Sequence, residues 1–167
     1  MPRDLLLLLV LLVLLACGRA VSPAAPPCVV SRVVDGDTFY CRDGRKVRLI
    51  GVDSPELAQG APGRAARDAL SRLLPQGAAV RLEEDAAPTD RYGRVLAWVW
   101  SDAGLVNEAL VRGGWAVLYT VPPNVKYASR VERAQKEARA SRAGLWNGSA
   151  FECPPNEYRR HACPTDR

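Results

Sequence analysis

Three acidic residues and one arginine lie within a short stretch of this 167-residue chain: Asp37, Arg48, Asp53 and Glu56. Carboxylate oxygens are hard ligands, so a metal held by these acids, with Asp35 beside them, should be Ca²⁺ or Mg²⁺. Taken singly, each acid has an ordinary structural explanation as a turn, strand-start or helix-cap residue. Grouped carboxylates repel one another, however, and a bound cation relieves that repulsion. The stretch therefore predicts a metal site.

Arginines supply the second half of the chemistry. Arg94, far along the chain from Arg48, is either a bidentate clamp on a phosphate, which guanidinium geometry suits, or a solvated residue at the start of a strand. Tyr92 beside it either stacks on a base or covers the domain core. The single histidine, His161, lies near the C-terminus and is expected to be solvated, which excludes chemistry that needs a core histidine. Carboxylates and arginines together predict a metal-dependent site that cleaves phosphodiesters.

Length and charge limit the alternatives. The chain has room for one domain of roughly 130 residues and a tail, but not for a second core. The formal net charge of +5 favours a polyanionic partner, either nucleic acid, anionic lipid or acidic glycan.

The N-terminus has the pattern of an export signal. Residues 5–16 are apolar, too short to span a bilayer and typical of a signal-peptide core, so we assign 1–20 to a signal peptide. Cleavage after Ala20 would release a soluble protein. Leu15-Ala16-Cys17 instead resembles a bacterial lipobox, which we favour because a cysteine at this place is otherwise unexplained. We expect an exported protein, either secreted or a cell-envelope lipoprotein attached to the membrane only through lipidated Cys17.

An even number of cysteines follows this signal: Cys28, Cys41, Cys153 and Cys163. Behind an export signal this count predicts two disulfides, for which three pairings exist. We favour the local pairing, Cys28 with Cys41 and Cys153 with Cys163. A tight turn at Asp35-Gly36 would place Cys41 opposite Val30 and leave Cys28 diagonal to it, at the margin of bridging geometry.

The elements that must position the site follow a simple order. Residues 21–27 form a Pro-rich linker, 28–146 a single domain, and 147–167 an irregular tail that depends on its disulfide for order. Turn signals and apolar periodicity predict strands over 29–34, 38–41, 46–52, 79–83 and 94–100, an extended segment over 115–121, and helices over 64–74, 105–112 and 127–143. Short strands interrupted by helices are typical of an α+β barrel of the oligonucleotide-binding kind.

The register of the second and third strands brings the site residues together. If Asp43-Gly44 is a two-residue loop, Phe39 lies opposite Arg48, and Asp37 shares a face with Arg48. Asp53 leaves the third strand at the end where the second begins, roughly 10 Å beyond the partner of Asp37 on an ideal strand. A modest bend would close that gap.

Four motifs carry a family resemblance: Val34-Asp35-Gly36-Asp37-Thr38, Arg48-Leu49-Ile50-Gly51-Val52-Asp53-Ser54-Pro55-Glu56, Thr89-Asp90-Arg91-Tyr92-Gly93-Arg94 and Val106-Asn107-Glu108-Ala109-Leu110-Val111-Arg112. In this order and spacing, from Val29 to Trp146, the chain resembles the staphylococcal (thermo)nuclease family. The resemblance implies a five-stranded oligonucleotide-binding (OB) β-barrel with three α-helices.

The resemblance also implies roles for the acids. Asp37 and Asp53 would bind Ca²⁺ through their carboxylates, and Ser54 would bind it through its backbone carbonyl. Glu56 would position or deprotonate the attacking water. The implied reaction is Ca²⁺-dependent hydrolysis of DNA and RNA at the 5′ P–O bond, which leaves 3′-phosphate ends.

By the same resemblance, Arg48 and Arg94 would hold the scissile phosphate and stabilise the charge of the five-coordinate transition state. Tyr92 and Tyr119 would contact the nucleotide. A second tyrosine expected near Val121 is missing, and the cysteines and the tail lie outside the family pattern. We expect a monomeric, exported Ca²⁺-dependent nuclease. The alternatives are a non-catalytic nucleic-acid-binding OB-fold domain and an envelope scaffold lipoprotein, and the presence of the acids and both arginines favours the nuclease.

Overall fold

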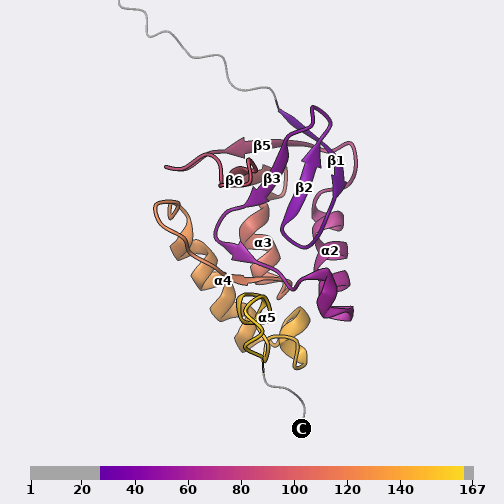
Figure 1. The fold of residues 1–167 in the computed structure, drawn as a ribbon, viewed down its shortest axis with the longest axis vertical. Helices are drawn as coiled ribbons and strands as arrows, with labels where there is room; N and C mark the ends of the chain where they lie inside the picture. The colour runs from indigo at the N-terminus through magenta and orange to yellow at the C-terminus, as the bar shows by residue number, and fades with distance from the viewer. Residues whose placement is uncertain (1–26, 164–167) are drawn as a thin grey trace, which may run out of the picture.

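The computed structural model describes residues 27–163, and its centre is a closed β-barrel (Figure 1). Its strands are β1 (Cys28–Val33), β2 (Thr38–Cys41), β3 (Lys46–Leu49), β5 (Ala79–Glu83) and β6 (Val95–Ser101). Strand β1 pairs antiparallel with β2 and β5, β2 pairs with β3, and β5 pairs with β6. A parallel pairing of β3 with β6 closes the ring. The expected five-stranded OB barrel of the α+β class is confirmed.

Helices and short strands complete the domain. The remaining elements are β4 (Val52–Asp53), β7 (Gly104–Leu105), β8 (Val117–Leu118), α2 (Ala61–Leu73), α3 (Val106–Arg112), α4 (Ala128–Ala140), α5 (Pro155–Tyr158) and the 3₁₀ turns η1 (Leu57–Gln59) and η2 (Gly144–Asn147). The three expected helices are present as α2, α3 and α4, with their ends shifted by up to three residues. Helix α5 lies in the tail, where no helix was expected.

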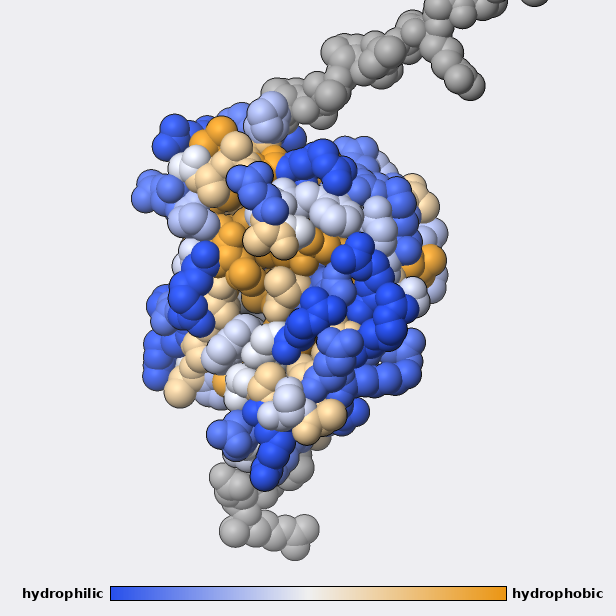
Figure 2. Space-filling view, turned by 180° about the vertical axis from the view of Figure 1, so that it is seen from behind, coloured by the Kyte–Doolittle hydropathy of each residue, from blue (hydrophilic) through white to orange (hydrophobic). Residues whose placement is uncertain are grey.

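The apolar stripes of the helices explain why they pack where they do. In α4, Val131, Ala134 and Ala138 recur at helical spacing and are buried, so one face of an otherwise charged helix packs against the domain. Helix α3 lies between α2 and α4 (Figure 1). Figure 2 shows the molecule from behind, where apolar side chains gather near the middle of the face and hydrophilic side chains surround them.

The third strand differs from the prediction because it breaks at Gly51. The expected strand over 46–52 divides into β3 and β4, and β4 pairs with β8 instead of continuing in the barrel. Gly51 has a left-handed φ of 75°, and an added Cβ would lie 2.7 Å from Trp98 Cη2. The chain turns here beneath the buried indole, and this turn supplies the bend that brings Asp53 back toward β2.

The predicted register of β2 with β3 is wrong by one residue. Phe39 lies opposite Val47, and Arg48 lies opposite Thr38. The loop has three residues, Arg42 to Gly44, because the Cys41 N–H donates to the Arg45 carbonyl at 2.9 Å and Gly44 has a left-handed φ of 91°. This is the common three-residue hairpin with a glycine in the left-handed position.

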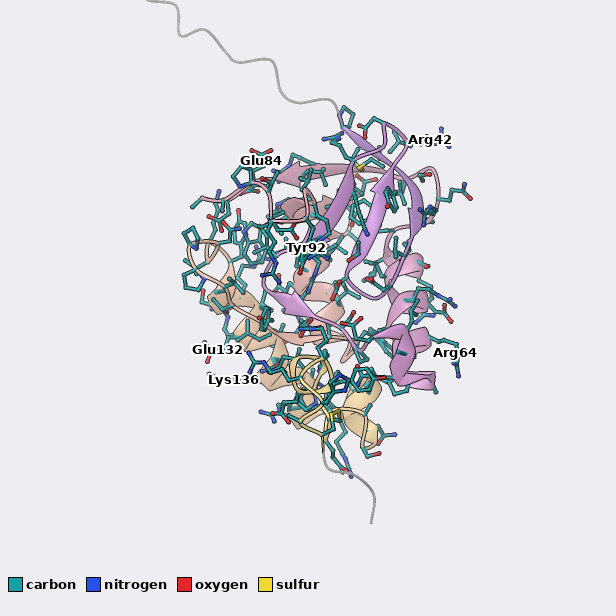
Figure 3. All side chains as sticks on the ribbon, viewed as in Figure 1. Arg42, Arg64, Glu84, Tyr92, Glu132 and Lys136 are labelled. Carbon is teal, nitrogen blue, oxygen red and sulfur yellow. A yellow bond between two sulfur atoms is a disulfide. The ribbon has the colours of Figure 1, made fainter. Side chains whose placement is uncertain are left out.

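Both favoured disulfides are present, and their sulfur–sulfur bonds are drawn in yellow in Figure 3. Val30 lies opposite Cys41 as expected. The Cα atoms of Cys28 and Cys41 are 5.4 Å apart, well within bridging range, so the diagonal position was not the obstacle that the sequence suggested.

The N-terminal predictions fall on residues that the structure does not describe. The signal peptide over 1–20, the lipidated Cys17 and almost all of the linker over 21–27 lie outside the described residues and stay predictions. Among residues 27–163, no helix is long and apolar enough to cross a membrane.

Candidate active site

One cavity of about 590 Å³ collects nearly all of the predicted site residues. Its lining includes Asp37, Arg48, Ser54, Glu56, Tyr92, Arg94 and Tyr119. Asp53 does not line the cavity because it is fully buried, but it contacts Arg48, which does. Strands β2, β3 and β4, the loop before β6 and the segment after β8 all contribute, so residues remote in sequence meet on one face of the barrel.

Arg48 brings two of the carboxylates together. Its Nη2 lies 3.1 Å from Asp37 Oδ2 and 3.2 Å from Asp53 Oδ1. Its Nη1 donates to the carbonyls of Leu49 and Val52, both at 2.9 Å. The guanidinium therefore holds the turn after β3 and reduces the repulsion between two acids that converge on one nitrogen atom.

Asp37 is held further by its neighbours. The Ser54 backbone N–H and hydroxyl both donate to Asp37 Oδ2 at 3.0 Å, and the Thr38 hydroxyl donates to Oδ1 at 2.9 Å. These donors compensate a carboxylate that is only 6 % exposed. They also place the Ser54 main chain directly beside Asp37.

Burial makes two acids at this site, Asp35 and Asp53, harder to ionise. It raises the pKa of Asp53 above its usual range, although Arg159 and Arg48 oppose the shift. Burial, and then repulsion from Asp37, raise the pKa of Asp35 to about 6. A positive charge added nearby would stabilise the ionised form of both carboxylates.

Arg94 reaches the same cavity from the start of β6. Its Nε donates to Asp90 Oδ2 at 2.6 Å, and its backbone N–H donates to Asp90 Oδ1 at 3.0 Å. Burial tends to raise the pKa of Asp90, but the hydrogen bonds from Arg94 outweigh burial and hold this pKa below its usual range. The pair fixes one edge of the guanidinium and orients Arg94 at the cavity wall.

Two aromatic rings lie at the rim of the cavity. Tyr92 is 68 % exposed and Tyr119 is 39 % exposed, so both rings are open to a ligand. Figure 3 shows Tyr92 over the middle of the face, well away from Arg64 at the outer edge of α2. Tyr92 therefore does not cover the core, which was the alternative that its sequence left open.

One residue of the site was missed by sequence reasoning. Arg159, in the tail, lies 2.7 Å from Asp53 Oδ2 through Nη2, and its Nη1 lies 3.1 Å from Asp53 Oδ1 and 2.7 Å from Glu56 Oε1. These bonds raise the pKa of Arg159 above its usual range. The only signal in the sequence was that Cys153 and Cys163 enclose a segment rich in charge.

The donor set fits a hard divalent cation. Carboxylates of Asp37 and Asp53, the Ser54 carbonyl and the nearby Glu56 are all oxygen donors, as Ca²⁺ and Mg²⁺ prefer. Among residues 27–163, no three side chains of His, Cys, Asp or Glu form a ready-made metal cluster. A set of two carboxylates and a carbonyl leaves coordination positions for water or for substrate oxygens.

Comparison with known proteins agrees with the family resemblance that the sequence motifs indicate. The family model described as staphylococcal nuclease homologue matches residues 46–148. The thermonuclease of Staphylococcus intermedius is 42 % identical over 126 residues, which cover 71 % of this chain and 74 % of that protein. The thermonuclease of Staphylococcus hyicus is 41 % identical over 126 residues with the same coverage. Endonuclease YncB of Bacillus subtilis (strain 168) is 33 % identical over 132 residues, which cover 73 % of this chain and 62 % of that protein.

Proposed function

This chain belongs to the staphylococcal nuclease family and is a nuclease, and we propose that it is an exported, Ca²⁺-dependent phosphodiesterase that hydrolyses both DNA and RNA to products with 3′-phosphate ends. One observation carries the proposal. Arg48, Arg94, Asp37 and Glu56 come from separate elements and line one cavity, and Arg48 also contacts the buried Asp53.

The acids would hold the metal and handle the proton. Asp37, Asp53 and the Ser54 carbonyl are the ligands that we assign to Ca²⁺, which when bound would neutralise charge on the phosphate oxygens. Glu56 lines the cavity and takes a proton from the water that attacks phosphorus. The bond from phosphorus to the 5′ oxygen then breaks, and that oxygen leaves with a proton from solvent.

The arginines would bind the phosphate. A guanidinium presents parallel N–H groups that match two phosphate oxygens, and Arg48 and Arg94 both line the cavity. As the transition state gains charge, donors fixed in place stabilise it more than water does. The Asp90 ion pair supports this role because it positions Arg94 before substrate arrives.

The substrate range follows from the rim. Exposed Tyr92 and Tyr119 can stack on any base, since every base has an aromatic face, so the site should accept DNA and RNA alike. The net charge of +5 would add attraction for the backbone. A single barrel of this kind is expected to act as a monomer.

Export rests on residues 1–20. We propose that the signal is removed and that Cys17 becomes a lipidated N-terminus, with cleavage after Ala20 as the alternative. Mass spectrometry of the mature N-terminus separates a lipidated Cys17 from a start at Val21.

The function is tested by incubating the purified mature protein with single- and double-stranded DNA and RNA, in Ca²⁺ or in chelator. We expect cleavage in Ca²⁺ only, and its near loss in Glu56→Gln. Glu132→Gln is the matched control because Glu132 lies on α4, paired with Lys136, away from the cavity (Figure 3). Degradation that survives chelation, or saturable binding without cleavage, would contradict the proposal.

A further inference from the structure

The tail places the positively charged guanidinium of Arg159 against two carboxylates of the site, those of Asp53 and Glu56. Arg159 contacts both oxygens of Asp53 and one oxygen of Glu56. Asp53 Oδ1 also accepts from Arg48, so both oxygens of this buried carboxylate have guanidinium partners. A bidentate guanidinium–carboxylate pair is among the stronger polar contacts in proteins.

These contacts compete with a metal. A divalent cation bound by Asp53 needs the same oxygens that Arg159 now contacts, at 2.3 to 2.6 Å in the case of Ca²⁺. Two positive charges at that spacing repel each other. Arg159 and a metal ion therefore compete for Asp53.

The covalent structure of the tail keeps Arg159 near the site. Cys153 and Cys163 close a ring that contains Arg159. Gln59 links this ring to the backbone of Glu56. Its Nε2 donates to the Cys153 carbonyl at 3.2 Å, and its Oε1 accepts the Glu56 N–H at 2.8 Å. Figure 1 shows the tail packed at the lower end of the molecule, in front of α4. A tethered group of this kind acts at a high effective concentration.

We propose that the disulfide-closed tail is an intramolecular inhibitor, in which Arg159 occupies the metal-binding carboxylates and must withdraw before a divalent cation binds. The inference rests on the proposed function, because it requires Asp53 to be a metal ligand.

The expected effect follows from the fraction of molecules with Arg159 withdrawn. The apparent metal affinity falls by that fraction, so a tail seated nine-tenths of the time weakens binding about tenfold. Removing Arg159 should therefore strengthen Ca²⁺ binding by the same factor. Arg159→Lys keeps the charge but loses the bidentate fork, and should lie between the wild type and Arg159→Ala.

The test is titration of the mature protein with Ca²⁺ by calorimetry, without nucleic acid. We expect Arg159→Ala to bind Ca²⁺ about tenfold more tightly or better, and Arg160→Ala to match the wild type. Arg160 is the matched control because it carries the same charge on the next residue, is exposed and does not line the cavity. The double variant Cys153→Ser with Cys163→Ser should also bind Ca²⁺ more tightly than the wild type, since it opens the ring.

Thermal unfolding gives an independent readout. In chelator, Arg159→Ala should melt below the wild type because a buried carboxylate loses a partner, and added Ca²⁺ should raise its melting temperature more than that of the wild type. Equal Ca²⁺ affinity in the wild type and Arg159→Ala overturns the inference and leaves the proposed function standing. Absence of Ca²⁺ binding in both overturns the proposed function, and the inference with it.

Discussion

Asn107 links the barrel to the turn that carries Asp53, and its replacement by alanine gives the sharpest structural prediction. The side chain is fully buried at the start of α3. Its Nδ2 donates to the carbonyls of Ile50 at 2.8 Å and Ala97 at 3.3 Å, and its Oδ1 accepts the Val99 N–H at 2.9 Å. One amide thus joins β6 to the residue that precedes the turn at Gly51.

The magnitude follows from the groups left behind. Alanine would leave the Val99 N–H and the Ile50 carbonyl without this side-chain partner, and each such buried group costs about 1–3 kcal/mol. We therefore expect Asn107→Ala to lower the free energy of unfolding by about 2–6 kcal/mol. That is a large part of the 5–15 kcal/mol typical of a domain.

Urea unfolding followed by tryptophan fluorescence measures this change, with the disulfides kept intact. The midpoint should fall while the slope m stays constant. Asn147→Ala is the control, because Asn147 is exposed and its replacement should change stability by less than about 0.5 kcal/mol. A loss below about 1 kcal/mol in Asn107→Ala would refute the claim that these hydrogen bonds hold the turn.

Three further outcomes are expected. Although burial opposes it, hydrogen bonds from Lys126 and three other side chains lower the pKa of Glu83 from 4.5 to about 2. Ionised Glu83 therefore stabilises the folded state by roughly 3 kcal/mol. This contribution is complete above pH 4.5 and is lost as the pH falls from 4.5 to about 2, so Glu83→Gln should flatten the pH dependence of the free energy of unfolding in that window. Gly51→Ala should lower the melting temperature, because the added Cβ meets Trp98 at 2.7 Å and the φ is left-handed; an unchanged melting temperature would contradict this. Tyr92→Ala should weaken binding of single-stranded DNA by about 1–3 kcal/mol without changing the melting temperature, and unaltered binding in filter assays would exclude stacking.

Local patterns predicted most of the architecture. The spacing of Val131, Ala134 and Ala138 marked the buried face of α4, and Asp-Gly pairs marked both hairpins. The register of β2 with β3 was missed because the loop at Asp43 uses three residues, a choice that depends on how the flanking strands twist. Arg48 still reaches Asp37, since its long side chain spans a shift of one residue.

The site could be predicted only as far as local motifs reach. The acids and Arg94 lie in recognisable segments, so their types and order indicated the chemistry. Arg159 lies 106 positions from Asp53, in a tail with no apolar periodicity, and its place depends on the course of the disulfide-closed ring. No local pattern encodes that contact.

The central claim is that Arg94 acts at the same cavity as the acids, and single-turnover cleavage of DNA in saturating Ca²⁺ tests it most directly. Losing a fixed donor to the transition state costs about 10²–10³ in rate, so Arg94→Ala should lose that much with its fold retained. Arg64→Ala, on the outer edge of α2, should cleave at the wild-type rate (Figure 3). A rate for Arg94→Ala within about threefold of the wild type, far below the donor effect expected, would contradict the account.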